Sequence, residues 1–238
     1  GSAFFGVVVF AGSVLGFEAV DFDLLFEVDL GFDSAFGPSL GSAGFQLRPH
    51  FAGGLLCGRR FCRGAAVFRG DEKDVLSRYL GAARMVDADV ILRVTSDCPL
   101  IDPWVCEAVI KAREQQEADY AANNMPRLFP HGLDCEAFTR SALEQAASEA
   151  TEGYDREHVT PWLRRSPDLR RVNVIGPGWP ANQQRWTLDY PEDLEFFRKL
   201  FADLPRNTIP TWQDALSRIN EVPGLATTNI RHRVGSTM

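Results

Sequence analysis

The chain of 238 residues carries 32 Asp and Glu against 25 Lys and Arg, which gives a formal net charge of −7. This acidic balance argues against general nucleic-acid binding, because a protein that holds a phosphate backbone needs a basic face. No apolar run reaches the ~18–20 residues of a membrane-spanning helix, and the length suits one large α/β domain.

The first 65 residues differ in composition from the rest of the chain. They hold 11 of the 17 Phe and 12 of the 20 Gly, and they contain no Lys, Ile, Thr, Asn, Tyr, Trp or Met. One interpretation is a Phe-rich β element, since residues 19–32 alternate apolar and acidic side chains as strands do. The interpretation that we favour is a reading-frame error, because such an error changes the amino-acid composition of a segment and keeps its length. Reading the DNA in all frames distinguishes the two: a basic Gly loop in another frame supports the error.

The cysteines favour a reducing cytoplasm. They form no Cys-x-x-Cys pair and are odd in number, so a disulfide framework is not expected; they are Cys57, Cys62, Cys98, Cys106 and Cys135. Zinc binding by His50 with Cys57 and Cys62 is the alternative, but the spacing is poor and structural or surface thiols are favoured. Residues 3–16 are as apolar as a signal-peptide core, but no basic segment precedes them, so secretion is not favoured.

From residue 74 onwards, helices and strands alternate. Helical periodicity predicts a helix over 74–86 with Val75, Tyr79, Leu80 and Ala83 on one side, and an apolar β-branched run predicts a buried strand over 89–95. Asp102 before Pro103 is typical of a helix start, with Asp as N-cap and Pro in the first turn. The further elements predicted are a helix over 102–117 and strands over 119–123 and 135–138.

The second half of the chain continues the alternation. Ser141 as N-cap, with Glu144 three residues on, predicts a helix over 141–150. The later elements predicted are an interrupted helix over 154–165, strands over 171–175 and 185–188, and helices over 191–204 and 211–220. Strands that alternate with helices indicate an α/β fold with a doubly wound, mostly parallel sheet.

Two acidic turns stand out in this pattern. Asp97 follows the strand over 89–95, and Asp189 follows the predicted strand over 185–188. Ligands of open α/β sheets bind at the carboxyl ends of the strands, and Mg²⁺ prefers hard oxygen ligands. We therefore expect Asp97 and Asp189 to share a divalent cation. The alternatives are a turn Asp that caps the following backbone and a helix-terminal Asp, a role that Glu192 and Asp193 fit better.

Five ordered motifs carry a resemblance to a known family. They span residues 67–79, 93–102, 130–134, 156–161 and 188–194. From about Val67 to Leu204 the chain resembles the cytidylyltransferases that activate sugars as CMP derivatives, both the SpsF-like spore-coat-polysaccharide branch and the acylneuraminate type. The resemblance implies the doubly wound fold of nucleotide-diphospho-sugar transferases. It also implies transfer of CMP from CTP to a sugar or sugar acid, with Mg²⁺ as cofactor and release of pyrophosphate, for cell-surface or spore-coat polysaccharide synthesis.

The resemblance also implies partners and further site residues. CTP and a sugar or sugar acid are the expected substrates, without nucleic acid or membrane, and a homodimer is plausible. Residues 130–134, with Gly132 and Asp134, resemble the family's acceptor-side loop, where His131 replaces a residue that is commonly acidic. Gly132 is expected to allow a close approach of backbone to ligand; the alternative is an ordinary turn. Arg93 is unusual in an apolar strand, and it either faces the nucleotide as a catalytic residue or pairs with Asp97 or Asp119.

Two basic groups complete the candidate set. Arg156, Glu157 and His158 either contact the acceptor sugar, with His158 as a base, or form a surface salt-bridge cluster. Arg185 either reaches a phosphate or covers the edge of the sheet.

The amino-terminal segment departs from the family pattern. The family follows its first strand with a loop of the form Gln-Ala-Arg-Met-Gly-Ser-x-Arg-Leu-Pro-x-Lys, whereas no Arg or Lys precedes Arg48 here. One alternative to the transferase is therefore a remnant that lacks the triphosphate loop. A second alternative is a nucleotide-sugar glycosyltransferase that uses Asp87-x-Asp89. The second is less favoured, because that motif lies at the start of its strand.

Overall fold

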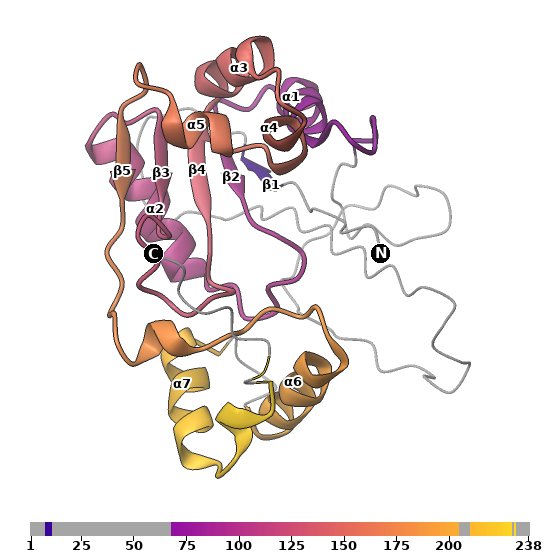
Figure 1. The fold of residues 1–238 in the computed structure, drawn as a ribbon. Helices are drawn as coiled ribbons and strands as arrows, with labels where there is room; N and C mark the ends of the chain where they lie inside the picture. The colour runs from indigo at the N-terminus through magenta and orange to yellow at the C-terminus, as the bar shows by residue number, and fades with distance from the viewer. Residues whose placement is uncertain (1–7, 11–67, 205–209, 230, 232–238) are drawn as a thin grey trace, which may run out of the picture.

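The computed structural model of the chain describes residues 8–10, 68–204, 210–229 and 231 (Figure 1). The Phe-rich alternation over 19–32 and the candidate zinc ligands His50, Cys57 and Cys62 lie outside these residues. The division into a segment over 1–65 and a domain over 66–238 therefore stays a prediction.

The described part contains strands and helices in alternation along most of its length. The strands are β1 (Val8–Phe10), β2 (Val90–Arg93), β3 (Tyr120–Ala122), β4 (Glu136–Thr139) and β5 (Arg171–Asn173). The helices are α1 (Val75–Met85), α2 (Pro103–Gln115), α3 (Arg140–Glu149), α4 (Gly153–His158), α5 (Pro161–Arg165), α6 (Pro191–Asp203) and α7 (Trp212–Glu221), with short 3-10 helices η1 (Ala181–Gln183) and η2 (Leu225–Thr227).

One sheet holds the described strands together, in the order β1-β2-β4-β3-β5. Strand β4 is antiparallel to both of its neighbours, β2 and β3, whereas β5 is parallel to β3. Consequently β2, β3 and β5 run in one direction, and β1 and β4 run in the other. The α/β class is confirmed. The prediction of a mostly parallel sheet does not hold for the described strand pairs, because β3–β5 is parallel and the other three pairs are antiparallel.

Side chains alternate between the two faces of the sheet along each strand. Helices pack against both faces. Ile91, Tyr120 and Phe138 enter a buried cluster with α1, α3 and α5. Their neighbours Leu92 and Ala137 enter a second cluster with α2, α6 and α7. This arrangement is the doubly wound layering that the alternation of elements predicts (Figure 1).

Side chains cap the amino-terminal ends of helices α2 and α3. The Oδ1 of Asp102 accepts hydrogen bonds from Trp104 N at 2.9 Å and Val105 N at 3.1 Å, so the predicted cap of α2 is confirmed. The prediction of Ser141 as the cap of α3 is wrong. Thr139 caps that helix instead, accepting from the backbone N of residue 142 at 3.1 Å, because β4 runs directly into the helix.

Two further predictions concern interrupted elements. The helical pattern over 154–165 divides into α4 and α5 with Pro161 at the start of α5, as expected of a residue that lacks an N–H group. The strand predicted over 185–188 does not form. Arg185 makes only an isolated parallel bridge to His131, so this segment is an extended connection beside the sheet.

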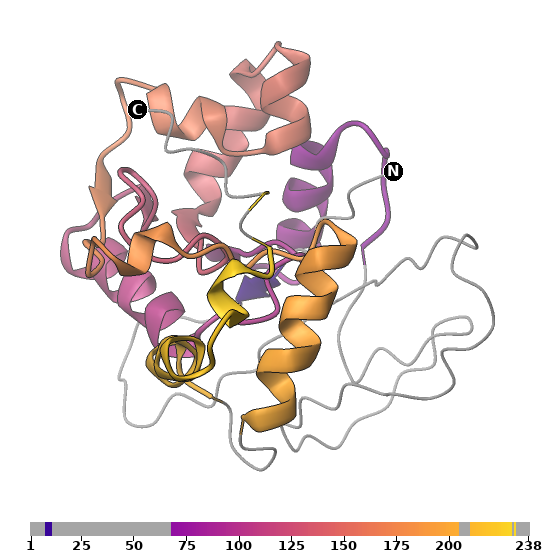
Figure 2. The same ribbon diagram turned by 60° about the horizontal axis from the view of Figure 1, so that its bottom comes forward.

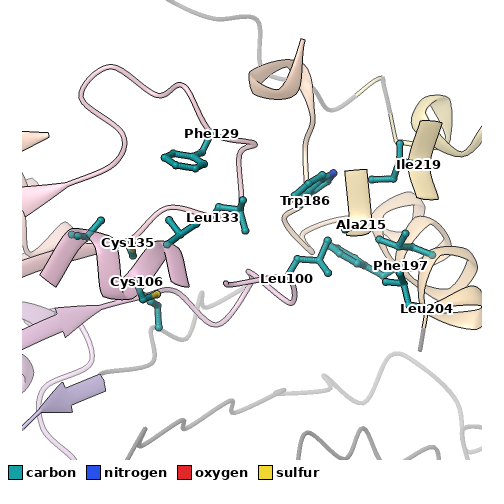
Figure 3. Close-up of a cluster of buried hydrophobic side chains, with 14 of the residues drawn as sticks. Leu100, Cys106, Phe129, Leu133, Cys135, Trp186, Phe197, Leu204, Ala215 and Ile219 are labelled. Atoms are coloured by element: carbon teal, nitrogen blue, oxygen red, sulfur yellow. The ribbon is translucent and has the colours of Figure 1, made fainter. Parts of the chain in front are cut away.

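The two carboxyl-terminal helices pack on each other at the lower end of the molecule. Both α6 and α7 contact η2, which lies between them in Figure 2. Leu100 and Trp186 join this core to the sheet, near Phe197 and Ile219 (Figure 3). No helix among the described residues is both long and apolar enough to span a membrane.

Candidate functional site

The two acidic turns lie side by side. The turn of Asp97 follows β2, and the turn of Asp189 precedes α6. The backbone N–H of Leu188 donates to the carbonyl oxygen of Asp97 at 2.8 Å. Asp97 is half-buried, and the side chain of Asp189 is 44% exposed. The fold thus brings together two carboxylate-bearing turns that are almost a hundred residues apart, and it leaves Asp189 open to solvent.

The predicted acceptor loop over 130–134 lies along the second acidic turn. His131 N donates to Gln184 O at 3.0 Å, and Trp186 N donates to His131 O at 2.6 Å. These two bonds are the bridge that replaces the predicted strand over 185–188. Backbone hydrogen bonds therefore join the acceptor loop and the two acidic turns, which together are called the acidic-turn site.

Gly132 has a structural reason for its identity. Its φ is +113°, and a Cβ on this residue would lie far inside van der Waals contact of the Trp186 carbonyl group. We expected Gly132 to allow a close approach of backbone to ligand. The close approach that the structure shows is to the Trp186 backbone, which holds the acceptor loop against the second acidic turn.

Replacing Gly132 with alanine is expected to lower the free energy of unfolding by about 1–3 kcal/mol, because strain at positive φ adds to the clash with Trp186. Urea unfolding measures the change. Gly153→Ala is the matched control, since nothing lies within 4 Å of a Cβ at that position. An equal effect of the two substitutions would contradict the close-approach explanation.

Asp134 and His131 are the two ionisable side chains of the loop over 130–134. Asp134 Oδ1 accepts from Arg127 Nε at 2.9 Å, and Asp134 Oδ2 lies 3.8 Å from His131 Nε2. Burial lowers the pKa of His131 below its usual value, and the positive charge of Arg127 lowers it further. His131 is therefore neutral near pH 7, and it, rather than His158, is the histidine that lies beside the acidic turns.

Arg185 is buried, and its predicted contact with a phosphate stays a prediction. Its side chain is 5% exposed, and its Nη2 donates to Asp189 Oδ2 and to Asp193 Oδ2, the latter at 3.2 Å. The guanidinium thus lies directly behind the Asp189 carboxylate, where it balances part of the negative charge of the turn.

Arg93 lies at the end of β2 but pairs with neither Asp97 nor Asp119. Its Nη1 donates to Glu136 Oε2 at 2.5 Å, across the register pair of β2 and β4. Both of the pairings that we considered are therefore wrong. A catalytic role of Arg93 stays a prediction, and the contact that the structure shows is a buried ion pair.

The three predicted contacts on α4 lie apart from the acidic-turn site. Arg156 donates to Asp74 Oδ2 from Nε at 2.9 Å and from Nη2 at 2.6 Å, which joins α4 to the first residues of α1. Glu157 is exposed, and the ring of His158 packs against Tyr154 with centroids 4.4 Å apart. Helix α4 and helix α6 lie at opposite ends of the view in Figure 1. Arg156 therefore acts as an interhelical contact in this structure.

The donor set fits Mg²⁺ better than a fully protein-bound metal. Within the described ranges, no three His, Cys, Asp or Glu side chains gather to hold a metal ion. Mg²⁺ commonly uses one or two carboxylates and takes its other ligands from water and substrate phosphates. Among the described residues, the buried hydroxyl oxygen of Thr187, two residues before Asp189, also has no hydrogen-bond partner. The oxygen atoms of Asp97 and Asp189, with that hydroxyl nearby in the chain, match such a site.

Sequence reasoning missed two residues that the fold makes important, Glu136 and Asn229. Glu136 is 1% exposed and binds two arginines, and Asn229 is equally buried beside Asp193. The helix-terminal role predicted for Asp193 is confirmed, because its side chain accepts from the backbone N–H of Tyr190 at the start of α6. An acid in an otherwise apolar strand was a usable signal for Glu136, parallel to the one that drew attention to Arg93. No local pattern singles out Asn229, because its partners are distant in the sequence.

Comparison with known proteins identifies a family and similar relatives. A family model described as "Cytidylyltransferase" matches residues 58–215. The chain is 36% identical to the uncharacterized protein MJ1063 of Methanocaldococcus jannaschii over 139 residues, which are 58% of this chain and 56% of that protein. It is 31% identical to the spore coat polysaccharide biosynthesis protein SpsF of Bacillus subtilis over 168 residues, 69% of each chain.

A solved structure shares the fold as well. The cytidylyltransferase from Leptospira borgpetersenii superimposes with a TM-score of 0.64 at 29% identity, covering 68% of this chain and 69% of that one. The family model covers well over half of the chain, and it includes both acidic turns and the acceptor loop. The chain belongs to the cytidylyltransferase family.

Proposed function

We propose that this protein transfers CMP from CTP to a sugar or sugar acid and releases pyrophosphate. The observation that carries the proposal is the hydrogen bond from Leu188 N to Asp97 O, which joins the two acidic turns in a chain of this family. A site for nucleotidyl transfer needs oxygen ligands next to an acceptor surface, and the acceptor loop adjoins both turns.

In this proposal Asp97 and Asp189 hold Mg²⁺. The ion, when bound, neutralises charge on the triphosphate and on the pyrophosphate leaving group. Arg185 holds the Asp189 carboxylate from behind, so that its exposed side faces the substrates. Catalysis by this arrangement consists mainly of positioning and charge neutralisation.

The acceptor binds beside His131 and Asp134. Asp134 is 19% exposed at its side chain and is held by Arg127, so its carboxylate is oriented towards one side. Such a fixed carboxylate suits hydrogen bonding to sugar hydroxyl groups. Neutral His131 has a nitrogen that can accept a proton from an attacking hydroxyl group.

The proposal extends to the biosynthetic process that uses the product. Since SpsF of Bacillus subtilis is named for spore coat polysaccharide biosynthesis, we propose that the product feeds synthesis of a cell-surface or spore-coat polysaccharide. A cytoplasmic location and a homodimer remain predictions from the sequence.

The glycosyltransferase alternative loses its main support. Asp87 and Asp89 are exposed, and both bind Arg140, with 3.3 Å between Arg140 Nη2 and Asp89 Oδ1. They lie at the start of β2, away from the carboxyl edge where Asp97 lies. A metal motif at that position would face no acceptor loop.

A product assay tests the proposal. The full chain is incubated with CTP, Mg²⁺ and a panel of sugars and sugar acids, and the released phosphates are separated. The proposal predicts pyrophosphate together with a CMP-linked sugar. A parallel incubation replaces CTP with nucleotide sugars, and release of nucleoside diphosphate there, without pyrophosphate in the first incubation, would support the glycosyltransferase alternative instead.

A further inference from the structure

A buried polar cluster lies behind the second acidic turn. Its members are Arg185, Asp193 and Asn229, which are 5%, 0% and 1% exposed. Burying a charged or amide group is costly unless its hydrogen-bonding capacity is used. The positions of these three side chains are therefore tightly determined by one another.

Asp193 connects the cluster to the backbone of the acidic turn. Its Oδ2 accepts from the backbone N–H groups of Asp189 and Tyr190, both at 3.0 Å, and from Arg185 Nη2 at 3.2 Å. Through these three hydrogen bonds, the Asp193 carboxylate fixes both the backbone that carries Asp189 and the guanidinium that pairs with it.

Asn229 closes the cluster from the carboxyl-terminal part of the chain. Its Nδ2 donates to Asp193 Oδ1 at 2.8 Å and to the carbonyl oxygen of Arg185 at 3.1 Å. It follows η2, which packs against α6 and α7 (Figure 2). If Asp193 only capped the first turn of α6, it would not require a hydrogen bond from the side-chain amide of Asn229. The contact ties a distant segment to the turn itself.

We propose that Asp193 and Asn229 are positioning residues that hold the Asp189 carboxylate in place as a metal ligand beside the turn of Asp97. The inference rests on the proposed function, since it assigns these side chains a role in the same site. It makes the segment that follows α7 a part of that site. Residues that orient a metal ligand commonly change metal affinity 10–100-fold when they are replaced.

The test compares Asn229→Asp with Asn220→Asp in the full chain. The first substitution keeps the shape of residue 229 but removes both donated hydrogen bonds. The second adds the same charge at an exposed position on α7. Asn229→Ala, which adds no charge, serves as a second variant in case the first does not fold. Each ¹⁵N-labelled protein is titrated with Mn²⁺ alone, well below its melting temperature, and paramagnetic broadening of the Asp97 and Asp189 amide signals is followed. Amide hydrogen exchange at Asp189 and Tyr190 is measured on the same samples.

We expect at least tenfold faster exchange at these two amides and about tenfold weaker Mn²⁺ affinity in the Asn229 variants, with Asn220→Asp unchanged. A merely structural role would lower the melting temperature and leave both readouts as in the original chain, which would overturn the inference alone. If the unsubstituted chain shows no broadening at either turn, the proposed metal site fails, and the positioning role fails with it.

Discussion

Replacing Asp189 with asparagine is expected to slow pyrophosphate release from CTP by about 10²–10³-fold, the typical cost of removing one preorganised group that stabilises developing charge. The amide keeps the shape of the side chain but loses the negative charge that would hold Mg²⁺. Asp97→Asn should have an effect of similar size, because the two turns are joined through Leu188. Steady-state assays of pyrophosphate release at saturating CTP measure both changes.

The matched control is Asp168→Asn, at an exposed position outside the acidic-turn site. The control should keep the rate of the original chain. Rates within twofold of each other for all three variants would show that neither carboxylate binds the ion, and the proposed metal site would be wrong. A greater Mg²⁺ requirement in the Asp189 variant would separate loss of metal binding from loss of folding.

Replacing Glu136 with alanine is expected to lower the free energy of unfolding by about 3–5 kcal/mol, as is usual when one partner of a buried ion pair is removed. Glu136 Oε2 lies 2.5 Å from Arg93 Nη1, and Glu136 Oε1 lies 2.5 Å from Arg164 Nη2. Tyr120 also donates to Glu136 Oε1. Without the carboxylate, the guanidinium groups of Arg93 on β2 and Arg164 on α5 lose their shared counter-charge.

The pKa of Glu136 gives this prediction a pH signature. Burial alone would raise the pKa, but Arg93 and Arg164 lower it from 4.5 to about 2. A carboxyl group with a lowered folded-state pKa stabilises the fold fully above its unfolded value, and this contribution disappears as pH falls towards 2. The shift corresponds to about 3 kcal/mol. Acid unfolding between pH 4.5 and 2 should therefore be less steep in Glu136→Gln than in the original chain.

Glu149→Gln is the control for this titration, since Glu149 is an exposed carboxylate on α3. Urea unfolding at pH 7, 4 and 3 measures the free energy of unfolding of the original chain, Glu136→Gln and Glu149→Gln. Parallel pH dependence in Glu136→Gln and the original chain would mean that the buried ion cluster does not control acid stability.

Local chemistry explains which features of the fold were predictable. The Asp102 cap, the break at Pro161 and the alternation of strands and helices depend on neighbouring residues, and the structure confirms them. The Ser141 cap was wrong because Thr139 is an equally good capping residue two positions earlier. Sequence alone does not show where β4 ends.

Tertiary contacts explain what the sequence did not predict. The segment over 185–188 has the apolar and β-branched residues of a strand, but the bridge to His131 and the contact with Gly132 hold it beside the sheet. Arg93 forms its ion pair with Glu136 because β2 and β4 are neighbouring strands. No local sequence pattern reveals which strands are neighbours. The adjacency of Asp97 and Asp189 was predicted from their strand-end positions, whereas the support from Asn229 depends on how the carboxyl-terminal helices pack.

The most direct test of the central claim is the thermal midpoint of this chain with CTP, UTP, ATP or GTP, each with and without Mg²⁺. A ligand that binds only the folded state at 100 times its Kd adds roughly 2.7 kcal/mol, a rise of roughly 5–10 °C for a chain of this size. We predict such a rise with CTP alone among the four nucleotides, and only when Mg²⁺ is present. A chain that melts cooperatively and shifts with none of them would contradict the proposed transferase and favour a remnant without a nucleotide site.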